Sequence, residues 1–295
     1  MLSKFAQTLA LGAAALACAM PAAHATPAYA LSNNGATLIR FDTATPGTVT
    51  VVGAISGAIA NLGGLDFRPA DSLLYGYSDA SDSVYTVNLA TGATTLVTAI
   101  SAPTTSRLLG IDFNPAADRL RIVNDVDQNL RVNVAGGATI VDGTLAYAAG
   151  DPNVGANPNI VDAAYTNSDR NPVTGTTLYY IDYVLDILVS TSNPNGGVLN
   201  TVGALGINTS SFVGFDILSD GVGGNLAFAS LTDAAGVPRL YSVNLGTGAA
   251  TLVGGISAVE VSGLALAPVF IPEPGSMALF GLAGLALVTA RRRRV

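Results

Sequence analysis

Hydrophobic residues in this chain alternate with polar ones in short runs, which is the pattern of β-strands with one buried face. One stretch shows four such runs in succession: GIDFNP, RLRIVN, NLRVNV and ATIVDG. Asp, Asn, Gly, Thr and Ser are abundant between the runs, and these residues favour tight turns because their side chains bond neighbouring amides or because they tolerate unusual backbone angles. The pattern therefore predicts an all-β fold.

The runs recur as a larger unit. Five similar segments begin about 50 residues apart, which is the period of a β-propeller blade of four strands: GLDFRP, GIDFNP, DAAYTN, GFDILS and GLALAP, starting at Gly64, Gly110, Asp162, Gly214 and Gly263. A second segment follows most of them and indicates two strands joined by a glycine-containing turn: VNLATGATTLV, VNVAGGATIV and VNLGTGAATLV.

The two ends of the repeated region together make one more blade. Tyr29 to Ile55 holds three strands without a first, and Val261 to Pro268 holds a first strand without the other three. Their pairing would close the ring and leave no unpaired sheet edge at the chain ends. We predict five blades, with six as the alternative if Gly150 to Asn159 contains further strands.

The string GIDFNPAADRLRIVNDVDQNLRVNV, followed by DGTLAYAAGDPNVGANPNIVDAAYTN, resembles the family called domain of unknown function 4394. The resemblance covers most of Tyr29 to Pro268. It implies no activity, because none is established for the family.

The last 27 residues have three parts in a fixed order. The tripeptide Pro272, Glu273, Pro274 precedes an uncharged apolar run from Gly275 to Ala290, and Arg291, Arg292, Arg293 and Arg294 follow. As a helix the run spans about 24 Å, and flanking arginines snorkel across the rest of a bilayer core. This arrangement resembles the PEP-CTERM sorting signal of Gram-negative bacteria, which implies an exosortase as partner. An ordinary C-terminal membrane anchor is the alternative.

The N-terminus indicates a secretory signal peptide. Lys4 provides the positive region, Leu9 to Ala19 is apolar, and the small-residue box Ala23-His24-Ala25 follows. We expect signal peptidase to cleave between Ala25 and Thr26. Acylation of Cys18 is the alternative, although the residue three places before it is alanine where a lipoprotein box has leucine.

Removing the signal peptide also removes Cys18, His24 and Lys4, the sole cysteine, histidine and lysine of the chain. An exported domain without them has no disulfide, thiolate nucleophile, Ser-His-Asp triad or histidine-ligated metal. Carboxylate chemistry, hydrogen bonding and oxygen-ligated cations such as calcium remain.

The exported region is strongly acidic. Between Thr26 and Ile271 there are 8 Arg, 18 Asp and 1 Glu, a net charge of −11. Such a surface repels nucleic acid and anionic lipid. We therefore expect no nucleic-acid partner.

Propeller geometry places the turns between second and third strands on the same face as the connections between blades. This face is predicted to carry Asn33, Asn34, Asp79, Asp82, Asp125, Asp127, Asn129, Asp182, Asp186 and Asp233, together with the long connections Ser101 to Leu109 and Gly150 to Asn159. Long loops on a rigid scaffold are common binding sites. An acidic, amide-rich face suits calcium or a hydroxyl-rich glycan.

The segment NDVDQN places oxygen-bearing side chains at Asp125, Asp127 and Asn129 in alternation. Its start resembles a calcium loop, but Leu130 replaces the required glycine and no glutamate closes the loop. The alternative is that these are turn residues bonding their own backbone.

Asp66, Asp112 and Asp216 occupy one equivalent position in the predicted innermost strands. They predict a carboxylate ring at the central channel, interrupted by Tyr165 and Ala265 in the other two blades. Such a ring could bind a cation or act as acid and base. The alternative is a structural role, in which each carboxylate bonds an adjacent blade, with Arg107 or Arg121 as ionic partner.

Three domains are predicted: residues 1–25 as signal peptide, 26–268 as β-propeller and 269–295 as sorting signal. The favoured function is an exported, non-catalytic surface or matrix protein, processed by exosortase and associated with exopolysaccharide. No catalytic residue is assigned, and calcium is the one cofactor considered. The alternatives are a glycan-acting enzyme with paired carboxylates, one of them Glu260, or a calcium-binding adhesive module.

Overall fold

The computed structural model describes residues 25–57, 61–169, 171, 173–220 and 223–268. The predicted signal peptide up to His24 and the predicted sorting segment lie outside the described residues. Among those described, no helix has the length and apolar character needed to cross a membrane.

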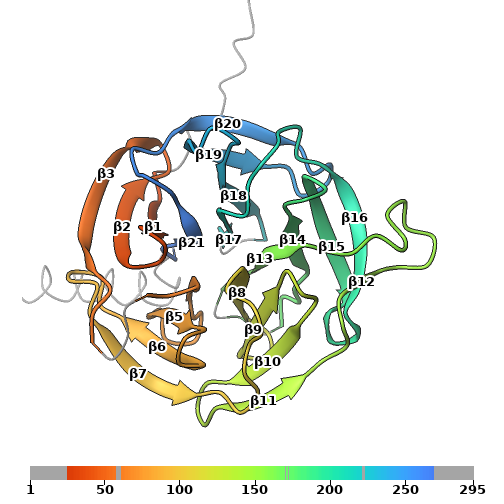
Figure 1. Cartoon of the computed structure of the whole chain (residues 1–295), viewed down its shortest axis with the longest axis horizontal. Helices are drawn as coiled ribbons and strands as arrows, with labels where there is room; N and C mark the ends of the chain where they lie inside the picture. Colours follow the sequence, from red (N-terminus) through yellow and green to blue (C-terminus); the bar gives the residue numbers. More distant parts are fainter. Residues whose placement is uncertain (1–24, 58–60, 170, 172, 221–222, 269–295) are drawn as a thin grey trace, which may run out of the picture.

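Five β-sheets surround a central axis, so the predicted five-bladed propeller is confirmed (Figure 1). The strands are β1 (Pro27–Ser32), β2 (Thr37–Asp42), β3 (Thr45–Ala54), β4 (Gly64–Phe67), β5 (Leu74–Ser78), β6 (Ser83–Val87), β7 (Thr94–Ala99), β8 (Leu109–Asn114), β9 (Arg119–Asn124), β10 (Asn129–Asn133), β11 (Ala138–Val141), β12 (Ala146–Tyr147), β13 (Ile160–Tyr165), β14 (Leu178–Asp182), β15 (Ile187–Asn193), β16 (Val198–Ala204), β17 (Val213–Ser219), β18 (Asn225–Thr232), β19 (Pro238–Val243), β20 (Ala250–Gly255) and β21 (Ser262–Leu266). One short 3-10 helix, η1 (Pro194–Gly196), precedes β16.

Strands from both ends of the domain close the ring, as predicted. The first sheet has the order β21-β1-β2-β3, and Tyr29 of β1 lies opposite Ala265 of β21. The six-bladed alternative fails because Gly150 to Asn159 contains no strand. The short strand before this connection, β12, pairs in parallel with β16 and gives that blade a fifth strand.

The hydrophobic core lies between neighbouring blades, with one cluster at each of the five interfaces in the described part of the chain. At one interface Tyr75 of β5 meets Phe113 of β8 edge to face, with ring centroids 5.1 Å apart. Burying each such side chain stabilises the fold by about 1.5–3 kcal/mol. Packing between the blades therefore holds the ring together.

The repeated glycines of the innermost strands allow these strands to approach closely around the axis. A Cβ atom on Gly110 would lie 2.3 Å from Asp162 Cα, and one on Gly214 would lie 2.8 Å from the backbone of Gly263. Real side chains do not occupy such distances. The first glycine of the repeated GxD segments is therefore a packing requirement.

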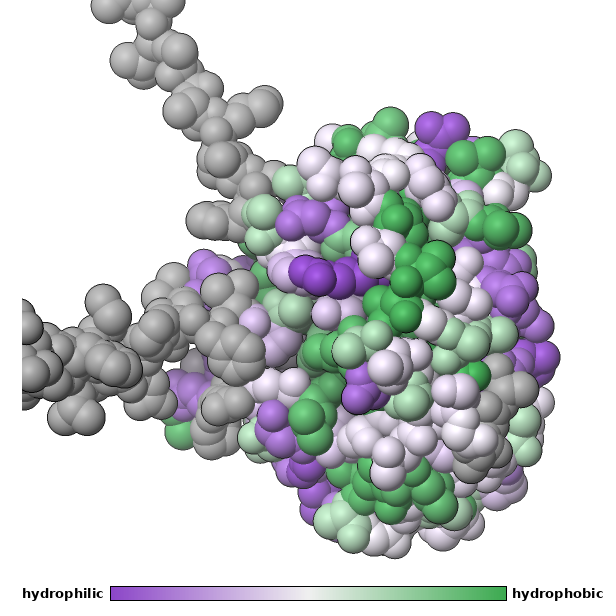
Figure 2. Space-filling view, turned by 90° about the vertical axis from the view of Figure 1, so that its left-hand side faces the viewer, coloured by the Kyte–Doolittle hydropathy of each residue, from purple (hydrophilic) through white to green (hydrophobic). Residues whose placement is uncertain are grey.

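The outermost strands β3, β7, β11 and β20 are largely exposed. Leu96 and Leu252 on this perimeter are 56% and 52% exposed. Figure 2 faces the flank formed by β3 and β7 and shows apolar areas scattered among weakly polar and hydrophilic ones. The threonine-rich outer strands thus form the side wall of the disc.

Candidate functional site

Four aspartates line the centre of the ring, one on each of four innermost strands. Asp66 lies on β4, Asp112 on β8, Asp162 on β13 and Asp216 on β17. All four are buried, with at most 5% of each residue exposed. We call them the channel carboxylates.

Each channel carboxylate accepts a hydrogen bond from the main chain of the next blade. Phe113 N donates to Asp66 at 2.7 Å, Tyr165 N to Asp112 at 3.1 Å, Phe215 N to Asp162 at 2.7 Å, and Leu266 N to Asp216 at 2.6 Å. These bonds connect neighbouring blades across four of the five interfaces. The geometry matches the structural interpretation of the aspartates, in which each joins one blade to the next.

The carboxylates also lie close to one another. Asp66, Asp112 and Asp216 each present an oxygen atom, and these atoms lie within 4.8 Å of one another. Burial, followed by the charge of Asp216, raises the pKa of Asp66, and burial, followed by the charges of Asp66 and Asp216, raises the pKa of Asp112. Burial also raises the pKa of Asp162 and brings that of Asp216 to about 7. The cluster therefore holds protons at mildly acidic pH.

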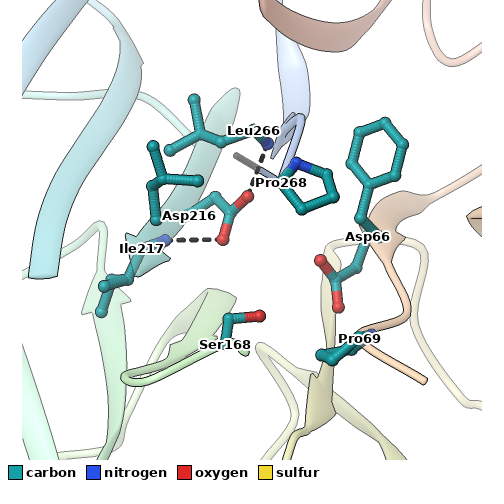
Figure 3. A pocket seen from close by; sticks show the side chains of 9 residues that line it. Asp66, Pro69, Ser168, Asp216, Ile217, Leu266 and Pro268 are labelled. Atoms are coloured by element: carbon teal, nitrogen blue, oxygen red, sulfur yellow. Dashed lines mark hydrogen bonds between the residues drawn. The ribbon is translucent and has the colours of Figure 1, made fainter. Parts of the chain in front are cut away.

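A small cavity adjoins this cluster (Figure 3). Asp66, Asp216 and Ser168 line it together with apolar side chains, and its volume is about 20 Å³. That is room for roughly one water molecule. A glycosidase needs two carboxylates on either side of a sugar, which this cavity does not admit.

The channel carboxylates meet only part of the requirement for a bound calcium ion. Calcium takes about six to eight oxygen ligands, whereas the three grouped aspartates place one oxygen each within 4.8 Å of the others. Both oxygens of Asp216 already accept main-chain N–H groups, from Ile217 and Leu266. The cluster alone therefore does not complete the coordination shell of a calcium ion.

The alignment of the repeats did not identify Asp162 as a member of this ring. In that alignment Asp162 corresponds to Gly110, and the residue that corresponds to Asp112 is Ala164, two residues later. Tyr165, which was predicted to occupy the aspartate position in this blade, is the residue after Ala164. Its N–H donates to Asp112. A register shift between Ile160 and Asp162 accompanies this change.

The expected arginine partners of the ring lie elsewhere. Arg107 forms its ion pair with Asp79, with Nε 3.4 Å from Oδ2. Arg121 is buried and pairs with Asp142 at 2.7 Å. Neither ion pair involves a channel carboxylate, so the ring carries no paired cation among the described residues.

Most of the predicted polar residues of the connection face shape its turns. Asn33, Asn34, Asp82, Asp127 and Asp186 have positive φ angles, which Asn and Asp tolerate better than most residues. Several carboxylates also bond nearby main chain: Asp82 accepts from Thr104 N, Asp186 from Thr209 N, Asp182 from Asn159 N, Asp233 from Val237 N, and Glu260 from Asn34 N.

The NDVDQN segment divides into two parts. Asn129 is buried, and its amide oxygen accepts from Arg121 at 2.6 Å, so it does not join the two aspartates. Asp125 and Asp127 each have a buried Oδ1 atom with no hydrogen-bond partner in the described structure. Burial, then the charges of Asp125 and Asp182, raises the pKa of Asp127.

The predicted cleavage point adjoins the first strand of the domain. Thr26 is 2% exposed, its N–H donates to Thr43 Oγ1, and β1 begins at the next residue. Ala25, on the other side of the predicted bond, is exposed. The sorting residues Pro272, Glu273, Pro274 and Arg291 to Arg294 lie outside the described residues.

Comparison with known proteins identifies two parts of the chain. The family model described as Domain of unknown function (DUF4394) matches residues 37–265, and the PEP-CTERM protein-sorting motif matches residues 270–294. No match is found among curated proteins.

Three solved structures show similarity at low identity. A structural genomics protein of unknown function from Bacteroides thetaiotaomicron VPI-5482 is 15% identical with a TM-score of 0.45, over 68% of this chain and 52% of that one. A chain of a nidogen/laminin complex is 12% identical with a TM-score of 0.47, over 82% and 98%. A putative 6-phosphogluconolactonase from Bacteroides uniformis ATCC 8492 is 14% identical with a TM-score of 0.39, over 79% and 82%. This chain thus spans about half the length of the first structure.

Proposed function

The chain belongs to the family described as Domain of unknown function (DUF4394), and we propose that it is a non-catalytic protein of the cell surface or extracellular matrix that associates with exopolysaccharide. The observation that carries this proposal is the PEP-CTERM motif at residues 270–294, which implies an exported protein sorted by exosortase. The acidic, rigid propeller is then the part delivered outside the cell.

The arrangement of the channel carboxylates supports a role without catalysis. A general acid or nucleophile has to reach its substrate. Here the four carboxylates are buried and bonded to main chain across blade interfaces, and the adjoining cavity holds about one water-sized group. These groups support an architectural function better than acid and base chemistry.

Fractionation of native-host cells tests the association with exopolysaccharide. We expect the protein in the polysaccharide fraction of the wild-type strain, and in the membrane fraction when exosortase is deleted. Enzymatic digestion of the polysaccharide should then release the protein from wild-type cells. Protein that stays with the cells after complete digestion would contradict the proposed association.

A calcium-binding adhesive module is the second candidate function, and the buried, unpartnered oxygens of Asp125 and Asp127 favour it. Leaving a buried carboxylate oxygen without a partner costs about 1–3 kcal/mol or more. A calcium ion would supply the missing contact. Because Asn129 is bonded to Arg121, such a site would use the two aspartates and backbone or water oxygens.

Thermal unfolding with and without calcium tests this second candidate. A ligand that binds the folded state raises the melting temperature by mass action. We expect calcium to raise it in the parent protein and in the control Asp233→Asn, whose Oδ1 accepts N–H groups of its own turn. The double variant Asp125→Asn, Asp127→Asn should lose the shift. An unchanged melting temperature of the parent at millimolar calcium would remove calcium from the account.

A further inference from the structure

A second cavity opens at the opposite end of the central channel, on the face of the blade connections. All five blades contribute to its wall, and its volume is about 60 Å³, room for roughly four water-sized groups. Its lining comprises Asn34, Leu62, Gly63, Arg107, Leu108, Leu109, Val161, Ser211, Phe212, Val213 and Ser262. We call it the axial pocket.

Arg107 is the one cationic residue among those that line the axial pocket. The Arg107 side chain is 53% exposed, and its Nε lies 3.4 Å from Asp79 Oδ2. Its guanidinium donates no hydrogen bond to any residue in the described part of the chain. By contrast, Arg121 donates to Asp142, Asn129 and Asn195. Apart from its ion pair with Asp79, Arg107 therefore has guanidinium donors free for a ligand, whereas the buried arginine uses its donors within the fold.

The remaining lining has both apolar and hydroxyl character. Leu109, Val161 and Val213 are almost fully buried, and the partly exposed Phe212 adds an aromatic ring. Ser211, Ser262 and Asn34 add hydroxyl and amide groups. A guanidinium binds carboxylates in a planar, two-point geometry, and apolar or aromatic surface suits the C–H face of a sugar ring.

We propose that the axial pocket binds the carboxylate end of a uronic acid residue of an exopolysaccharide. The inference rests on the proposed function, because it takes the polysaccharide association as its starting point and identifies the sugar class and site. Arg107 would hold the carboxylate, and the serine and asparagine groups would contact sugar hydroxyls.

The charge of the domain restricts how such a polymer binds. With a net charge of −11 between Thr26 and Ile271, the surface repels a long polyanion. The pocket is also confined to the mouth of the channel and has room for only part of one sugar ring. A terminal or branch uronate therefore fits this site, whereas an extended polyuronate chain does not.

Titration calorimetry of the exported protein with D-glucuronate tests the proposal, with D-glucose as the uncharged probe. Arg107→Gln should weaken glucuronate binding at least tenfold. The matched control Arg239→Gln removes another exposed arginine, which pairs with Asp233 and does not line the pocket. It should leave binding unchanged, and wild type should prefer glucuronate to glucose at least tenfold.

The outcomes separate this inference from the proposed function. Absence of glucuronate binding at millimolar concentration, or equal binding by Arg107→Gln and wild type, overturns the inference. If a strain carrying Arg107→Gln still retains the protein in the polysaccharide fraction, the association stands without this pocket. If glucuronate binds through Arg107 but the protein never enters that fraction, the site stands and the proposed function fails. Equal melting temperatures of the variants and wild type establish that both variants are folded.

Discussion

Replacing Asp112 by asparagine tests whether burial and the neighbouring carboxylates raise the pKa of Asp112 in the folded protein. Asp112 Oδ1 accepts the N–H of Tyr165, the single hydrogen bond found for this side chain in the described structure. The carbonyl oxygen of asparagine accepts the same N–H. Its NH₂ group then donates toward the oxygens of Asp66 or Asp216, so the substitution removes a charge and keeps the contact between blades.

The neighbouring Asp216 illustrates the sign of the pH dependence, because burial raises its pKa from 3.8 to about 7. A shift of about three units corresponds to about 4 kcal/mol, because each unit is worth 1.36 kcal/mol. The folded state keeps a proton that the unfolded chain releases near pH 4. The resulting stability is therefore complete below about pH 4 and is lost as the pH rises through 7.

The pKa of Asp112 is raised by burial and by the charges of Asp66 and Asp216. Its contribution to stability is therefore also present at low pH and lost as the pH rises. At pH 8 the asparagine variant should exceed wild type in unfolding free energy by about 1–3 kcal/mol, the usual cost of a buried polar group that lacks partners. At pH 4.5, where the folded wild-type cluster is protonated, the two proteins should agree within about 1 kcal/mol. The stability of Asp112→Asn relative to wild type must therefore increase with pH.

Urea unfolding measures this difference. The chain has 10 tyrosines and no tryptophan, so tyrosine fluorescence or far-UV circular dichroism follows the transition. Asp216→Asn is the matched control, because both of its carboxylate oxygens accept N–H groups and an amide leaves one of these donors unpaired. That variant should be destabilised by about 1–3 kcal/mol at pH 4.5. If Asp112→Asn lowers stability equally at pH 4.5 and pH 8, the pKa of Asp112 is not raised in the folded protein, and the reasoning is refuted.

Two further predictions concern packing and export. Gly110→Ala should lower the unfolding free energy by about 2–3 kcal/mol or more in a urea titration, because the new methyl group meets Asp162 Cα at 2.3 Å. Gly136→Ala, where no atom lies within 4 Å of the added group, should change it by less than about 1 kcal/mol, and equal effects would contradict the packing argument. N-terminal sequencing of the exported protein should begin at Thr26, whereas a lipid-modified Cys18 would show that signal peptidase does not cleave there.

The sequence predicted the propeller well because its repeats encode contacts that recur in every blade. A glycine at the start of β8 or β17 is needed where innermost strands meet, and this need appears at the same point of each repeat. Closure by β1 and β21 followed from counting strands, since the partial units at the two ends were complementary. The number of blades could thus be worked out without knowing any side-chain contact.

Individual site residues were harder to predict because their roles depend on direction and register. Asp162 joins the ring from a position two residues early, where β13 shifts its pairing, and the repeat alignment gives no signal of that shift. Asn129 alternates with Asp127 in sequence, yet it begins β10 and bonds Arg121 inside the fold. The axial pocket is formed by all five blades, so no single segment indicated it.

Mass spectrometry of the C-terminal peptide tests the central claim most directly, namely that this chain is an exported protein whose sorting signal is processed. The PEP-CTERM motif at residues 270–294 places the signal at the end of the chain. In protein released from the surface of an exosortase-bearing host, we predict that Gly275 to Val295 are absent, with cleavage close to Pro274. The variant with alanine at residues 272–274 should keep the tail. An intact Arg291 to Arg294 on released wild-type protein would contradict the account.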